Sequence, residues 1–385
     1  MDQWKFVTAG ESHGPGLVGI VEGVPAGVPL TRAMIDEDLA RRQKGYGRGG
    51  RMAIERDHVE IWGGVRHGLT LGSPVALTVS NRDYSNWRES MSPDPGVPDR
   101  VVTRPRPGHA DLVGGIKYGH RDLRNVLERA SARETTMRVA LGAVARAFLG
   151  QLEIEVRGHV TSIGSVSVPS RDYRLEEIRQ AEDSSVRVVD EGVAQDMMRV
   201  IDAAKEAGDT LGGVFEVVAF GLPVGLGSYV QWHQRLEAEL GRALLSIPAM
   251  KAVEVGAGFS QTPREGSAVH DAIWYEEGRG FTRRSNRAGG LEGGISTGMP
   301  LIVRVGMKPL STLMSPLGSF DIDSKEPFAA AVERSDVTAV PAAVVIGEAM
   351  VLHVLADAVL KKFGGDSLDE IRQRVQIWRE TTCQF

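Results

Sequence analysis

The sequence has almost no cysteine, and its first residues do not resemble an export signal. The single cysteine, Cys383, excludes an intrachain disulfide and any zinc site built from several cysteines. The segment Met1–Lys5 opens with an acid and lacks the basic and then apolar pattern of a secretory signal. We therefore expect a protein of the reducing cytoplasm.

Long uninterrupted apolar segments are also missing. The most apolar stretch, Ala339–Leu360, contains Pro341, Glu348, His353 and Asp357. These polar groups would be costly in a bilayer, so the stretch predicts a buried or amphipathic helix and no membrane partner. With 42% hydrophobic and 25% charged residues, the composition excludes a disordered chain. No repeat or linker divides the sequence, which predicts one domain spanning all 385 residues.

The chain has no overall excess of positive charge, yet its arginines are concentrated. A net charge of −5 and only 6% aromatic residues argue against a nucleic-acid partner. Between residues 101 and 140, however, seven arginines and one lysine face four acids, a local charge of about +4. A second basic group, among glycines, consists of Arg41, Arg42, Lys44, Arg48 and Arg51. Guanidinium groups bind carboxylates and phosphates through a fixed fork of donors, so we expect a site for two or more anionic groups.

Hydrophobic periodicity predicts an α+β fold in which helices cover antiparallel sheets. The expected strands are residues 17–24, 52–65, 75–81, 152–168, 213–224, 251–256, 272–276 and 301–307. The expected helices are residues 31–43, 129–150, 193–204 and 236–245, with a last helix that follows the capping box of Ser367 and Glu370. Residues 81–108 contain five prolines and predict a long loop.

The segment Gly10–Gly14 satisfies the pattern G-x-S-x-G, which in hydrolases presents a nucleophilic serine. A serine hydrolase that uses Ser12 is therefore one alternative, and a non-catalytic protein that binds polyanions is another. A nucleophile elbow needs a strand before the serine and a helix after it. Here we expect no core strand before Ser12, and Pro15–Val21 predicts a turn and a strand. A glycine-rich turn in which Ser12 and His13 bind backbone groups is the remaining alternative.

Three further segments contain groups suited to anion or proton chemistry. Arg104–Asp111 contains two prolines and a glycine beside His109, so its backbone would hold an imidazole rigidly. Ser285–Gly294 is rich in glycine, and its bare N–H groups could cradle an anion. Lys308–Thr312 places one cation and two hydroxyls after a strand, as a phosphate site requires. No histidine pair has the spacing of zinc ligands, so we expect no metal.

The sequence resembles the chorismate synthase family over nearly its whole length. The resemblance rests on the segments Gly10–Gly14, Asp38–Arg42, Arg48–Met52, Arg106–Asp111, Glu128–Thr135, Asn286–Gly294, Lys308–Thr312, Arg334–Asp336 and Ala339–Ala342. It implies the β-α-β sandwich fold of that family. It also implies conversion of 5-enolpyruvylshikimate 3-phosphate to chorismate and phosphate by anti 1,4-elimination, the last common step toward the aromatic amino acids. The reaction uses reduced FMN without net redox change.

The resemblance further implies which residues meet the substrate. They are Ser12, Arg42, Arg48, Arg51, Arg106 and Arg133. His13 is the expected acid for the leaving phosphate, because an imidazole, with a reference pKa of about 6.5, carries and releases a proton near neutral pH. His109 is expected beside the flavin as a second proton donor, and Asp336 as the group that accepts the proton from the flavin.

The flavin residues also follow from the resemblance. They are Arg129, Ala130, Ser131, Pro248, Ala249, Gly293, Lys308, Pro309, Leu310, Ser311, Thr312 and Arg334. Pro248 departs from the family, which commonly has a polar amide there, so one hydrogen bond to the flavin is expected from backbone or not at all. Arg42 and Arg48 correspond to positions associated with NADP in the family. NADPH is expected to act only indirectly, through a separate flavin reductase, and the chain is expected to form a homotetramer.

Overall fold

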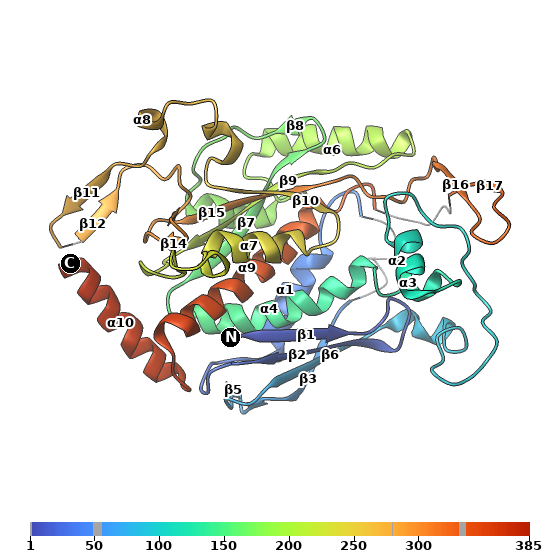
Figure 1. Ribbon diagram of the computed structural model, residues 1–385, viewed down its shortest axis with the longest axis horizontal. Coiled ribbons are helices and arrows are strands. Elements are labelled where there is room, and N and C mark those ends of the chain that lie inside the picture. The colour runs from blue at the N-terminus through green and yellow to red at the C-terminus, as the bar shows by residue number, and fades with distance from the viewer. Residues whose placement is uncertain (1, 49–55, 279, 331–335) are drawn as a thin grey trace.

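Two antiparallel sheets enclose a layer of helices, and the computed structural model shows this arrangement plainly (Figure 1). The structure describes residues 2–48, 56–278, 280–330 and 336–385. The first sheet has the order β1-β2-β6-β3, with strands β1 (Lys5–Ala9), β2 (Gly16–Glu22), β3 (Val59–Gly63) and β6 (Val75–Ser80). The second has the order β10-β15-β9-β7-β8, with β7 (Glu155–Ile163), β8 (Val166–Ser167), β9 (Gly213–Phe220), β10 (Met250–Val255) and β15 (Leu301–Met307). The expected α+β class is confirmed.

The helical layer packs both sheets together. Its central members are α1 (Arg32–Gln43), α4 (Thr135–Gly150), α7 (Leu236–Leu245) and α9 (Val340–Phe363), and the outer helices are α2 (Asp111–Tyr118), α3 (Arg124–Leu127), α5 (Leu175–Gln180), α6 (Glu191–Glu206), α8 (Gly266–Val269) and α10 (Leu368–Gln384). At one end of the molecule β11 (Ile273–Glu276) and β12 (Gly280–Arg283) project next to α10, and at the other end β16 (Gly318–Phe320) and β17 (Pro327–Ala329) lie near α2 (Figure 1). The remaining short hairpins are β4 (Val65–Arg66) with β5 (Leu69–Thr70) and β13 (Leu291–Glu292) with β14 (Ile295–Ser296).

Helix α9 is the buried helix that the sequence predicts. Among the described residues it alone is long and apolar enough to cross a membrane, and 89% of its apolar stretch is buried between the sheets. His353 on this helix accepts a hydrogen bond from Trp4 Nε1 at 3.0 Å, and its Nε2 contacts the carbonyl of Arg138 at 3.2 Å. Burial lowers the pKa of His353 to about 4, so the ring is neutral and part of the core.

Glu348, the other central polar group of α9, is fully buried and fully bonded. Its carboxylate accepts hydrogen bonds from Arg41 at 2.8 and 3.0 Å, from Arg146 at 2.7 Å and from the backbone N–H of Gly158 at 2.8 Å. Burial raises the pKa of Glu348, but the charges of Arg41 and Arg146 lower it by more, so that the pKa is about 2. Asp38 joins the group through Arg41 and Arg146, both at 2.8 Å. These groups form the core ion network, which fixes α1 against α4 and α9.

Three details of the sequence prediction are wrong. β1 was not among the expected strands, although it pairs with β2 from Lys5 to Ala9; as an edge strand with no buried residue it has only a weak hydrophobic pattern and is not a core strand. The strand expected from residue 152 begins at Glu155, since Glu153 has a left-handed φ of 60° that ends strand geometry. The helix expected from residue 129 begins at Thr135, after a 3-10 turn. Residues 52–55 of another expected strand lie outside the described residues.

Candidate active site

The segment Gly10–Gly14 is the turn between β1 and β2. Gly10 has a φ of +107°, and a Cβ there would lie 2.4 Å from the carbonyl oxygen of Gly16, so the turn requires glycine. Asn81 anchors the turn, because its Nδ2 donates to the carbonyls of Glu11 at 3.0 Å and Gly14 at 2.9 Å. Strand β2 follows where a nucleophile elbow has a helix, which argues against the hydrolase alternative.

His13 projects from this turn onto Glu128, which follows α3. The backbone N–H of His13 donates to Glu128 at 2.8 Å, and its Nδ1 lies 2.9 and 3.0 Å from the two carboxylate oxygens. Arg124 donates to the same carboxylate at 3.1 Å. Burial raises the pKa of Glu128, but the hydrogen bonds and charge of His13 and the bond from Arg124 lower it by more. Glu128 is therefore an anion that orients one edge of the imidazole.

His109 has a matching arrangement on the second loop. Its Nδ1 lies 2.5 Å from Asp111 Oδ1, and Arg106 donates to Asp111 Oδ2 through Nε at 2.9 Å and to Oδ1 through Nη2 at 3.1 Å. Burial raises the pKa of Asp111, but the bonds to His109 and Arg106 hold it well below its usual range. Each expected catalytic imidazole thus touches a buried carboxylate that an arginine also binds.

His109 and Glu128, the carboxylate that binds His13, lie at the same end of a helix pair. In α2, a Cβ at Gly114 would lie 2.5 Å from Val126, and one at Gly115 would lie 2.5 Å from Leu123. This contact pattern runs α2 antiparallel to α3 at close range, which only glycine permits. The start of α2, next to His109, therefore lies at the end of α3 that leads into Glu128.

Three expected substrate arginines gather around the start of α4. Arg42 Nη2 donates to the carbonyl of Ala132 at 2.9 Å and to Thr135 at 2.9 Å. Arg133 donates to Asp57 at 2.6 and 2.8 Å, and Arg48 Nε lies 3.2 Å from Asp336.

Electrostatics show how closely these guanidinium groups are crowded. Burial lowers the pKa of Arg42, the neighbouring charges of Arg48 and Arg133 lower it further, and Asp57 opposes them; the result is about 10. A further anion nearby would stabilise the charged form of a guanidinium with so low a pKa. We call Arg42, Arg48 and Arg133 the arginine pocket.

Ser12 and Asn81 connect the turn to this pocket. Ser131 Oγ donates to Ser12 Oγ at 3.2 Å, and Arg133 Nε donates to Asn81 Oδ1 at 2.9 Å. The structure therefore brings Ser12, His13 and the arginine pocket together, as the sequence predicts.

Lys308 and Ser311 close onto the His109 loop. Lys308 Nζ donates to the carbonyl of Gly108 at 3.0 Å and to Ser311 at 3.0 Å, and Ser311 Oγ donates to the same carbonyl at 3.0 Å. Burial and the charge of Lys251 lower the pKa of Lys308. The N–H of Lys308 binds the carbonyl of Ala249 at 3.0 Å, and Ala249 has a left-handed φ of 70°, unusual for a residue with a side chain.

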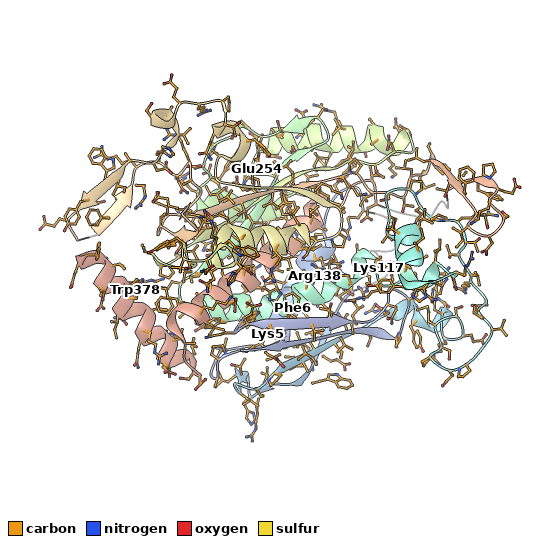
Figure 2. All side chains as sticks on the ribbon, viewed as in Figure 1. Lys5, Phe6, Lys117, Arg138, Glu254 and Trp378 are labelled. Carbon is orange, nitrogen blue, oxygen red and sulfur yellow. The ribbon has the colours of Figure 1, made fainter. Side chains whose placement is uncertain are left out.

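A cavity of about 460 Å³ lies between β1, the start of α4 and the end of α7. Its lining is Phe6, Val7, Thr8, Arg129, Ala130, Glu134, Arg138, Ser246, Pro248 and Met350. Figure 2 shows Phe6 on β1 and Arg138 on α4 close to one another in the middle of the molecule. The volume lies within the usual range of small-molecule sites, roughly 300–1,000 Å³.

Three expected flavin residues line this cavity, namely Arg129, Ala130 and Pro248, and its walls combine apolar surface with charged groups. Arg129 donates to the carbonyls of Gly10 at 3.1 Å and Thr8 at 3.0 Å, so its guanidinium fixes the wall at β1. His109 and Lys308 are not part of the lining. The mixed apolar and charged lining fits a flavin ring.

Gly293 is not part of the cavity lining. It occupies the turn between β13 and β14, before β15, whereas Lys308 follows the end of β15. Arg51 and Arg334 lie outside the described residues. Within the described residues, no group of three or more potential metal ligands is found.

Sequence reasoning missed Trp87, Asp57 and the role of Glu128. The ring of Trp87 stacks on His13 with 4.1 Å between centroids. Glu128 stands 115 residues from His13 in the sequence, so only the fold shows that they touch. The sequence signals for these residues were weak, because Trp87 lies in a loop of low hydrophobicity and Glu128 is one acid in a basic segment.

Taken together, the arginine pocket, the two carboxylate-bound imidazoles and the adjoining cavity define an enzyme site for a small polyanion and a second ligand. The sequence profile of the chorismate synthase family matches residues 4–360. Chorismate synthase 2 of Bacillus anthracis is 55% identical over 389 aligned residues, which cover 99% of this chain and 100% of the relative. Chorismate synthase of Listeria innocua is 54% identical over 388, with the same coverage.

A solved structure agrees with these relatives. The crystal structure of a chorismate synthase superposes with a TM-score of 0.82 at 42% identity, covering 99% of each chain. The chain belongs to the chorismate synthase family. Enzymes of this family are lyases that form chorismate and phosphate from 5-enolpyruvylshikimate 3-phosphate.

Proposed function

We propose that residues 1–385 form one domain that carries out this anti 1,4-elimination with reduced FMN. The observation that carries the proposal is the arginine pocket, in which burial first, and then the charges of Arg48 and Arg133, lower the pKa of Arg42 to about 10. The substrate bears two carboxylates and a phosphate, and its charge would relieve this repulsion. Arg42, Arg48 and Arg133, with Ser12 at the turn, bind these anions; Arg51 and Arg106 complete the proposed set.

Proton handling falls to His13, His109 and Asp336. His13 donates a proton to the oxygen of the leaving phosphate, while Glu128 balances the charge of the protonated ring. His109, on the loop held by Lys308 and Ser311, is the second donor, and Asp111 orients it. Asp336, beside Arg48, would accept the proton from the flavin.

The proposed flavin residues are Arg129, Ala130, Ser131, Pro248, Ala249, Gly293, Lys308, Pro309, Leu310, Ser311, Thr312 and Arg334. These residues would hold reduced FMN, whose chemistry would be reversible electron donation to the substrate without net oxidation. Lys308 and the hydroxyls of Ser311 and Thr312 suit a phosphate group, and the cavity lined by Phe6 and Met350 suits an apolar ring.

The proposal includes an environment and partners. We infer a cytoplasmic homotetramer that receives reduced flavin from a separate reductase, with NADPH acting only through that reductase or near Arg42 and Arg48. Helix α9, although apolar, is buried in the core, which supports a protein without a membrane partner.

An anaerobic assay of chorismate absorbance tests the proposal. Wild-type protein with photoreduced FMN is expected to turn over, and oxidised FMN with NADPH is expected to give no turnover until a flavin reductase is added. His13→Ala and His109→Ala should each lower kcat by about 10²-fold or more, the usual contribution of a general acid. Near-normal kcat in either variant would remove that histidine from the mechanism, and an inactive wild type would overturn the proposed function.

A further inference from the structure

One edge of the His13 ring is held by the buried carboxylate of Glu128. Glu128 is 3% exposed and accepts from both the backbone N–H and the Nδ1 edge of His13. Its own carbonyl accepts from the N–H of Ser12 at 3.1 Å. Glu128 therefore binds the turn at three points. The imidazole cannot rotate about the bond that joins it to Cβ without breaking a charge-assisted hydrogen bond.

The face of the same ring is fixed by an indole. Trp87 stacks on His13 with an interplanar angle of 28° and a centroid distance of 4.1 Å. The indole is itself held, since its Nε1 donates to Asp83 at 3.0 Å and the guanidinium of Arg100 lies 4.0 Å from its ring centroid. A stacked ring that is hydrogen-bonded at its edge and also contacts a guanidinium offers a rigid wall.

Arg124 joins these two supports. Its Nη1 donates to Glu128 at 3.1 Å, and its guanidinium lies 5.0 Å from the centroid of Trp87. Edge and face of the imidazole are thus fixed by one connected group from α3, the turn that follows it and the loop after β6.

We propose that Glu128 and Trp87 are positioning residues that hold the His13 imidazole in one orientation, with Nδ1 bound to Glu128 and Nε2 as the atom that exchanges a proton with the substrate. Fixing Nδ1 selects which nitrogen reacts. A general acid misplaced by about 1 Å can lose about 10²-fold in rate, so this orientation has catalytic value. The inference rests on the proposed function of His13.

The test compares kcat and KM in the full-length protein with photoreduced FMN. Glu128→Gln, nearly the same size but uncharged, should lower kcat by about 10- to 100-fold. Trp87→Ala should lower kcat by about 10-fold, whereas Trp87→Phe keeps a stacking ring and should stay within about 3-fold of wild type. KM should change less than kcat, because neither side chain is assigned to the substrate. Trp62→Ala is the matched control, since Trp62 is 73% exposed on β3.

A double-mutant cycle separates positioning from a structural role. In the His13→Ala background, Glu128→Gln and Trp87→Ala should cause no further loss of kcat, because the ring they orient is gone. A similar loss with and without His13 would overturn the proposal. So would normal kcat in Glu128→Gln and Trp87→Ala while His13→Ala is impaired. An active His13→Ala protein would instead refute the role of His13, and an inactive wild type the proposed function, so the failures are distinguishable. Thermal unfolding of each variant identifies any that do not fold. Where Trp87→Ala does not fold, Trp87→Phe is the decisive comparison.

Discussion

Arg41 and Arg42 are neighbours on α1, yet they belong to opposite electrostatic environments. Arg41 faces the core ion network, where Glu348, Asp38 and Glu182 raise its pKa by more than burial lowers it. Arg42 faces the arginine pocket, where burial and two other guanidiniums lower its pKa to about 10. A cation matched by carboxylates within the protein stabilises the fold. A cation crowded by like charges is arranged for an anion that arrives from outside.

Arg41→Met tests this comparison with the largest expected effect. It removes one of the two guanidinium groups that bind the buried carboxylates of Glu348 and Asp38, so the free energy of unfolding should fall by about 3–5 kcal/mol. Denaturant unfolding monitored by circular dichroism measures this loss. A decrease below about 1 kcal/mol would show that the core ion network contributes little to stability.

Arg42→Met should give the opposite result. Its kcat/KM should fall by about 10- to 100-fold, the value of one charge-assisted hydrogen bond of about 1.5–3 kcal/mol to the substrate. The free energy of unfolding should stay within about 1 kcal/mol, because the substitution also removes a costly buried charge. Arg121→Met is the control, since Arg121 is exposed and pairs only weakly with Asp323. Unchanged kcat/KM in Arg42→Met would contradict the anion site.

The smallest expected effect is stabilisation by inorganic phosphate. Because it binds the folded arginine pocket, phosphate at five times its Kd should stabilise the wild type by about 1 kcal/mol. The thermal midpoint should rise with phosphate more than with chloride of equal ionic strength, and the difference should shrink in Arg42→Met but persist in Arg121→Met. Equal responses in all three proteins would mean that phosphate acts elsewhere.

The sequence predicts much of this fold because most strands and helices carry regular hydrophobic patterns. β9 and β15 alternate or are continuously apolar, and α10 begins at the capping residue Ser367. β1 escaped prediction because, at a sheet edge, every second residue from Lys5 to Ala9 is exposed. The element limits near residues 152 and 164 depend on positive φ angles at Glu153 and Gly164, which no periodicity reveals.

The site divides in the same way. Its cations were predictable, because resemblance and charge clustering both point to Arg42, Arg48 and Arg133. The carboxylate partners of Arg133 and His13 were not, since Asp57 and Glu128 lie far along the chain from these two groups. Contacts of this kind are set by how the turn between β1 and β2, the segment before β3, α3 and the start of α4 converge. The roles of individual residues toward substrate and flavin remain predictions for the experiments above.

Asn81 gives the site a mechanical property that its small side chain would not suggest. One amide binds two carbonyls of the turn that carries His13 and, through its oxygen, the guanidinium of Arg133. An aspartate there would offer acceptors to carbonyls that are themselves acceptors, and the turn would lose its anchor. The turn that carries His13 and the guanidinium of Arg133 are consequently joined through one amide, so a displacement of either is transmitted to the other.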